Sequence, residues 1–139
     1  EIISRMGGRR NPFTFVNASS PAFLGQHSVR VSSSGELIIL DNVGNPPESR
    51  AERYTIDPVS KTATLASSYS SSPAVVTKIG GSVQRVSGGH VLISFGTAGR
   101  VEEYDADGRV VWRIDGNPGY VFRAQRILSL YAPGVGTPR

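Results

Sequence analysis

The chain has 139 residues, enough for one domain, and its 38% hydrophobic content is compatible with a buried core rather than with disorder. Its formal charge is +4, but the basic residues are dispersed and match no nucleic-acid-binding motif, so we expect no nucleic-acid partner. The absence of cysteine excludes disulfides and thiolate metal sites, and we expect neither a metal nor a cofactor. No apolar stretch approaches the roughly 18 residues needed to span a membrane.

Short Val, Ile and Leu runs separated by turn-forming residues follow one another along the chain, which predicts an all-β fold. The first predicted strand covers residues 2–6. The next predicted strands cover residues 26–32, 36–41, 50–56 and 62–69, and then residues 82–87, 90–95, 100–104 and 110–114. A last strand is predicted at 120–130. The separators include Ser34-Gly35, Asp57-Pro58, Gly88-Gly89 and Asp107-Gly108.

The two groups of four strands share sequence. Arg30-Val31-Ser32 matches Arg85-Val86-Ser87, and Glu52-Arg53-Tyr54 matches Glu102-Glu103-Tyr104. Four antiparallel strands repeated every 40–50 residues, roughly, are typical of β-propeller blades. We therefore predict a β-propeller fragment with two complete blades and partial blades at both ends. The alternative is a self-contained β-sandwich of about eight to ten strands.

The predicted boundaries divide the chain into four parts of one partial propeller domain. Residues 1–24 form the end of a preceding blade and a loop, 25–72 and 81–116 form the complete blades, and 119–131 form the first strand of a following blade. Tyr54, Tyr104 and Trp112 are expected to fill the spaces between blades. Two blades do not close a ring, so we expect a longer polypeptide whose remaining blades, or a second copy, cover the exposed faces.

Several short stretches, in order, resemble the C-terminal part of the β-propeller of the aryl-sulfate sulfotransferase family (arylsulfotransferase, ASST). They include Arg5-Met6-Gly7-Gly8-Arg9-Arg10, Gln26-His27, Leu40-Asp41-Asn42, Ser49-Arg50-Ala51, Tyr104-Asp105-Ala106-Asp107-Gly108 and Phe122-Arg123-Ala124. The resemblance implies an exported, six-bladed enzyme, periplasmic or extracellular, that moves a sulfuryl group from an aryl sulfate to a phenolic acceptor. It also implies a ping-pong route through a transiently sulfated histidine, without a cofactor.

The resemblance makes His27 the candidate catalytic residue, because the Gln-His histidine of these enzymes binds the anion and serves in acid/base steps. Neutral imidazole and imidazolium suit such a role near pH 7. His27 begins an innermost predicted strand, which would border the central channel near its mouth. The alternative is a buried histidine that is hydrogen-bonded within a blade.

Arg50 and Arg123 are the candidate substrate-binding residues, because a guanidinium binds sulfate oxygens well. Arg50 opens a strand after the loop that follows Asp41-Asn42, a pair that we interpret as turn-forming. A solvent-exposed Arg50 paired with Glu48 or Glu52 is the alternative. Arg123 would line the channel beside His27.

The stretch that matches the family's His-Tyr-Arg, which carries the sulfated histidine, is Val121-Phe122-Arg123 and contains no histidine. The chain could then use His27 alone, depend on residues of other blades, or bind without turnover. A non-catalytic propeller module that binds a protein or glycan is therefore the alternative function. A quinone-dependent propeller dehydrogenase is disfavoured, because no cluster of metal ligands is visible.

Overall fold

The computed structural model describes residues 5–19, 22–116 and 119–128, and these residues form an almost entirely β structure. The strands are β1 (Thr14–Val16), β2 (His27–Val31), β3 (Leu37–Asp41), β4 (Arg50–Asp57), β5 (Thr62–Ser70), β6 (Ser82–Arg85), β7 (Val91–Phe95), β8 (Arg100–Tyr104) and β9 (Val110–Asp115). Two short 3-10 turns, η1 (Ser87–Gly89) and η2 (Gly96–Ala98), are the helical elements of this part of the chain. The predicted all-β class is confirmed.

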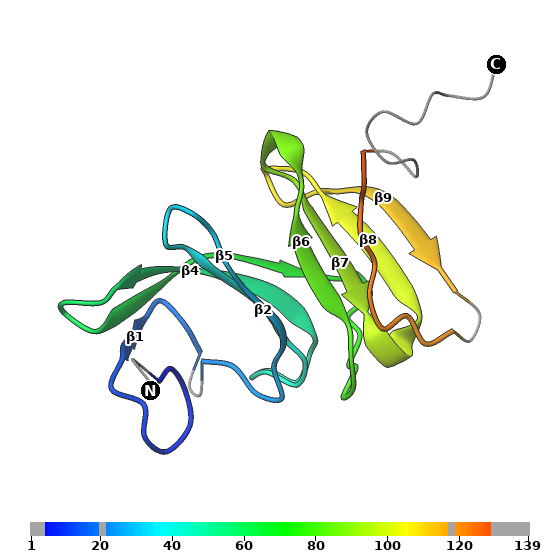
Figure 1. The fold of residues 1–139 in the computed structure, drawn as a ribbon. Helices are drawn as coiled ribbons and strands as arrows, with labels where there is room; N and C mark the ends of the chain where they lie inside the picture. The colour runs from blue at the N-terminus through cyan, green and yellow to red at the C-terminus, as the bar shows by residue number, and fades with distance from the viewer. Residues whose placement is uncertain (1–4, 20–21, 117–118, 129–139) are drawn as a thin grey trace.

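The strands form two sheets that lie side by side (Figure 1). The first has the order β1-β5-β4-β3-β2 and the second the order β6-β7-β8-β9. From β2 to β5 and from β6 to β9, each strand pairs antiparallel with the next along the chain. The two sheets are thus two copies of one four-stranded arrangement, to which β1 adds a parallel strand beside β5.

The predicted strands within each group of four agree with β2–β5 and β6–β9 to within two residues. The three-residue strand β1 was not predicted. Of the strand predicted at 2–6, residues 5 and 6 are not in a strand, and residues 2–4 lie outside the described residues. Of the strand predicted at 120–130, residues 120–128 are not in a strand, and residues 129 and 130 lie outside the described residues.

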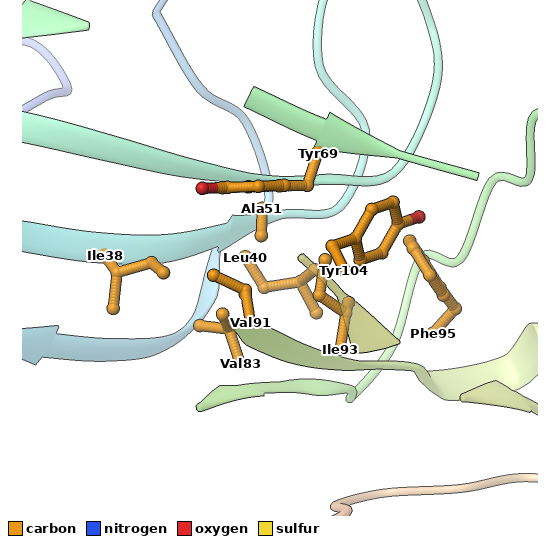
Figure 2. Close-up of a cluster of buried hydrophobic side chains, with 9 residues drawn as sticks. All are labelled: Ile38, Leu40, Ala51, Tyr69, Val83, Val91, Ile93, Phe95 and Tyr104. Carbon is orange, nitrogen blue, oxygen red and sulfur yellow. The ribbon is translucent and has the colours of Figure 1, made fainter. Parts of the chain in front are cut away.

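The main core lies between the two sheets (Figure 2). On β3 the side chains alternate: Ile38 and Leu40 face the second sheet, whereas Leu37 and Ile39 pack in a second cluster with Phe13, Phe23 and Tyr54. This alternation follows from the two-residue period of a strand, and burial of both faces explains why β3 is a continuous apolar run.

Trp112 lies on the edge strand β9 with 42% of its surface exposed, outside the core between the two sheets. The expectation that it fills a space between blades therefore remains a prediction, which concerns a blade beyond β9.

The third strands of the two sheets, β4 and β8, share a buried Glu-Tyr pair. The Tyr54 hydroxyl donates to Glu52 Oε2 at 2.7 Å, and the Tyr104 hydroxyl donates to Glu102 Oε2. In both strands the register shifts immediately before the tyrosine. Burial beside the carboxylate raises the pKa of both phenols far above their ordinary value. The repeat noticed in the sequence is therefore a repeat of side-chain contacts and backbone geometry.

A serine hydroxyl joins the first strand of each four-stranded arrangement, β2 or β6, to the chain segment that comes after that arrangement. Ser28 Oγ accepts a bond from the Val83 N–H at 3.0 Å and lies 3.5 Å from the Val83 carbonyl oxygen. Ser82 Oγ does the same with Ala124, at 3.0 and 3.4 Å. Residues 119–128, orange in Figure 1, thus hold the same relation to β6 as β6 holds to β2.

Candidate functional site

A buried asparagine follows β3 at the end of the first sheet. Asn42 is fully buried, and its Nδ2 donates to the carbonyl oxygens of Thr77 and Gly80, both at 2.9 Å. A carbonyl oxygen only accepts hydrogen bonds, so these two contacts fix the orientation of the amide. Asn42 Oδ1 must therefore face the other way, toward His27.

His27 begins β2 and is half-buried. Its Nδ1 lies 2.9 Å from Asn42 Oδ1 and 3.0 Å from the Gly25 carbonyl oxygen. Both neighbours are acceptors, so Nδ1 must carry a proton. The opposite nitrogen, Nε2, then has the lone pair of a neutral imidazole and lies 3.4 Å from the Gly80 N–H.

This arrangement suits proton transfer at Nε2. The hydrogen bond from the Gly80 N–H to Nε2 is long, so the protein holds Nε2 less firmly than it holds Nδ1. When Nε2 takes a proton, the Nδ1–H bond to Asn42 persists and helps to hold the imidazolium. The alternative predicted from the sequence, a histidine hydrogen-bonded inside one blade, is met only in part. Gly80, one of the partners of His27, belongs to residues 71–81, the linker between the two sheets.

The linker that contacts His27 is itself held by buried hydroxyls. Ser49 Oγ donates to the Asn42 carbonyl oxygen at 2.6 Å and accepts from the Thr77 N–H at 2.7 Å. Thr77 Oγ1 in turn accepts from the Thr97 N–H at 2.8 Å. Ser49 and Thr77 are buried, so the linker has a fixed course past the imidazole.

Arg50 opens β4 and is enclosed by acidic groups. Its side chain is 7% exposed, and its nitrogens lie 2.8 Å from Glu52 Oε1, 3.2 Å from Asp41 Oδ2 and 3.2 Å from Glu48 Oε1. Burial raises the pKa of Asp41 and of Glu52. Burial alone would lower the pKa of Arg50, but the carboxylates, Glu52 first, raise it overall.

The ion pairs that the sequence offered as an alternative for Arg50 are both present, but Arg50 itself is buried rather than solvent-exposed; Glu52 is buried with it, whereas the Glu48 side chain is 24% exposed. The prediction that Arg50 binds the substrate remains a prediction. Arg50 and His27 are connected through adjacent residues, because Asp41 pairs with Arg50 and Asn42 bonds to His27.

Arg123 lies in the segment that follows the second sheet. It is exposed, and its guanidinium carbon lies 5.9 Å from the ring centre of Phe122. The Phe122 carbonyl oxygen accepts from the Gly81 N–H at 3.1 Å, so this segment runs beside the linker that contacts His27. The described structure gives Arg123 no ion pair, and its predicted contact with the substrate remains a prediction.

Val121, which the sequence resemblance led us to align with the family's sulfated histidine, has its main chain held on both sides. Its N–H donates to the Gly96 carbonyl oxygen at 3.1 Å, and its carbonyl oxygen accepts from Ser94 Oγ at 2.6 Å. The backbone here is therefore well positioned, although the side chain is an inert valine.

Sequence reasoning missed the role of Asn42, which was interpreted as turn-forming together with Asp41. Asp41 does accept a local bond from the Val43 backbone, as a turn-forming residue would, but both residues are fully buried and each also contacts a functional candidate: Asp41 pairs with Arg50, and Asn42 bonds to His27. A signal was available for Asp41-Asn42: two polar residues directly end an apolar strand that pairs with the strand carrying His27, where His27 is opposite Leu40.

Two negative observations concern the part of the chain that the structure describes. It contains no helix long and apolar enough to cross a membrane. Within the same residues, no three His, Asp or Glu side chains are grouped so that they could hold a metal ion.

The family model for arylsulfotransferase (ASST) matches residues 2–117, which is most of the chain and includes His27, Asn42 and Arg50. No curated protein matches the sequence. With the match covering both sheets and the His27 site, the chain belongs to the arylsulfotransferase family.

Proposed function

We propose that the protein transfers a sulfuryl group from an aryl sulfate to a phenolic acceptor, and that His27 is its acid/base residue. The observation that carries the proposal is the tautomer of His27, because Asn42 leaves the lone pair on Nε2. The family match supports a sulfotransferase-like activity.

In the proposed reaction, Nε2 takes the proton of the acceptor phenol while the phenolic oxygen forms a bond to sulfur. The sulfur–oxygen bond of the donor breaks, its electron pair stays on the departing phenolate oxygen, and Nε2 returns the proton to that oxygen. The products are one phenol and one aryl sulfate, so protons and charge balance. Proton transfer by a positioned histidine contributes about 10²–10⁴-fold to a rate.

Arg123 and Arg50 are the proposed contacts for the sulfonate oxygens. Arg123 is exposed, and cations placed where negative charge develops lower the barrier of such transfers. Arg50 would have to exchange one of its three carboxylate partners for the substrate.

We further propose that the two sheets are adjacent blades of a β-propeller completed by further blades. The support is the repeated geometry: the same strand order, the same register shift before a buried tyrosine, and the same serine link to the next segment. Residues 119–128 would then begin the next blade, and the channel end of β2 would hold the active site.

The test measures nitrophenol release from p-nitrophenyl sulfate with phenol as acceptor, using the full-length protein. His27→Ala should lower turnover by at least about 100-fold. His90→Ala is the matched control, because His90 bonds to Glu103 on the second sheet and should leave turnover unchanged. Unchanged turnover in His27→Ala would contradict the proposed role, and a folded wild type without turnover would favour a non-catalytic binding module.

A further inference from the structure

A tyrosine that no sequence argument singled out lies against the residue that contacts His27. Gly80 donates its N–H toward His27 Nε2 at 3.4 Å. A Cβ placed on Gly80 would lie only 2.2 Å from the hydroxyl oxygen of Tyr120 and 2.9 Å from two of its ring carbons. Tyr120 therefore packs directly on the Cα of Gly80, in space that only a glycine leaves open.

The two side chains are close enough to act on one small group. Since Cβ and the amide nitrogen of one residue are about 2.5 Å apart, Tyr120 Oη and His27 Nε2 lie at most about 8 Å from each other. A sulfate ester with a hydrogen bond at each side spans a gap of about that length.

The Tyr120 hydroxyl is available for a ligand. The side chain is 53% exposed, and its hydroxyl has no hydrogen-bond partner among the described residues. The neighbouring hydroxyls differ, because Ser49, Thr77, Ser82 and Ser94 are all bonded to main-chain groups. Tyr120 thus brings an O–H donor that has no partner among the described residues to Gly80, the residue whose N–H contacts His27.

The backbone holds Tyr120 in this place. The next residue, Val121, is bonded through both its N–H and its carbonyl oxygen to the second sheet. The preceding Gly119 packs on Gly99, where a Cβ would lie 2.2 Å from the Gly119 carbonyl oxygen. The phenol therefore does not depend on a free loop for its position.

We propose that Tyr120 is a further substrate-contacting residue, whose hydroxyl donates a hydrogen bond to the phenolic oxygen of an aryl sulfate bound at His27. This inference rests on the proposed sulfuryl transfer. The proton stays on Tyr120, since His27 performs the proton transfers. A donor aimed at an oxygen that gains negative charge stabilises the departing phenolate, and it does so most for phenolates that are poor leaving groups.

The test compares Tyr120→Phe with wild type on aryl sulfates whose phenols differ in acidity. Loss of one hydrogen bond to a charged oxygen should lower kcat/KM about 10- to 100-fold for phenyl sulfate. The loss should be clearly smaller for p-nitrophenyl sulfate, whose leaving group needs little help. A variant that only disturbed the fold would lower both rates equally.

Gly80→Ala gives an independent test, because the added methyl group would displace the Tyr120 hydroxyl. Gly35→Ala is its matched control: Gly35 has a similar positive φ, +80° against +69°, but an added Cβ would meet nothing within 4 Å. Gly80→Ala should reproduce the leaving-group dependence of Tyr120→Phe, and Gly35→Ala should not.

The outcomes separate the two proposals. If wild type is active and His27→Ala inactive, but Tyr120→Phe affects both substrates equally or not at all, the role of Tyr120 is overturned and sulfuryl transfer stands. If the folded wild type transfers nothing, both are overturned.

Discussion

The amide of Asn42 determines which nitrogen of the His27 ring carries its proton. Two carbonyl oxygens of the linker, from Thr77 and Gly80, hold the NH₂ group of Asn42, and its oxygen is left for His27 Nδ1. Contacts between the first sheet and the linker to the second thus determine which nitrogen of His27 keeps its lone pair.

Asn42→Asp should test this relationship. The substitution keeps an acceptor toward His27 but replaces the NH₂ donor with an oxygen that faces two carbonyl oxygens. Unfolding in urea should show a loss of about 2–4 kcal/mol, because two buried acceptors lose their donor. Asn17→Asp, at an exposed residue, is the control and should change stability little. Equal stability of Asn42→Asp and wild type would contradict the assigned orientation.

Ser28→Ala should weaken the connection between the two sheets. The Val83 N–H loses its acceptor, and the free energy of unfolding should fall by about 1–3 kcal/mol. Ser67→Ala is a matched control on β5, since no described residue bonds to the buried Ser67 hydroxyl and its removal should cost nothing. The same denaturant titration measures both variants, and similar losses in the two would contradict the role of Ser28.

Glu52 and Glu36 should give opposite dependences of stability on pH. Burial raises the pKa of Glu52 above 4.5, so its contribution is fully present below pH 4.5 and is lost as pH rises through the folded-state pKa. The hydrogen bond from Arg85 is the main cause that lowers the pKa of Glu36. The contribution of Glu36 is therefore present above pH 4.5 and is lost as pH falls through its folded-state pKa.

The measurement is the urea midpoint between about pH 3 and pH 7 for Glu52→Gln and Glu36→Gln. Relative to wild type, Glu52→Gln should lose less stability as pH rises, and Glu36→Gln should lose less as pH falls. Parallel curves for the two variants would show that one of the two assigned directions is wrong.

Arg50→Ala should destabilise the protein by about 3–5 kcal/mol, because it leaves Asp41 and Glu52 buried without their cation. Arg30→Ala, at an exposed position on β2, should have little effect on unfolding. Arg50→Lys keeps the charge but loses the planar fork. If Arg50 also contacts the substrate, Arg50→Lys should raise KM under conditions where it is fully folded, and an unchanged KM would assign it a structural role alone.

The strands of both sheets could be predicted because their signal is local. Apolar runs such as Leu37–Asp41 are bounded by turn residues such as Gly35, which lies just before this run and has a φ of +80°. The three residues of β1 are too few for such a pattern, and their partner is the distant β5.

The candidate site around His27 was less predictable, because it is built from contacts between residues far apart in the sequence. His27 was found through its resemblance to a family, not through its neighbours. The partners of Asn42 lie 35 and 38 residues away in a linker without regular structure, and no local pattern indicates them. Tyr120 was missed for the same reason, since it comes near His27 only because both side chains contact Gly80, which is distant from each of them in the sequence.

The short parallel strand β1 has a practical consequence for how the chain can be shortened. It covers part of the outer edge of β5, and Phe13 and Phe23 from the same N-terminal segment cover the apolar face that carries Leu37 and Ile39. A chain cut to begin at Gly25 would leave an unpaired strand edge and an uncovered apolar surface, the combination that promotes aggregation. Poor solubility of such a fragment would report the loss of this cover, not a defect in the two sheets.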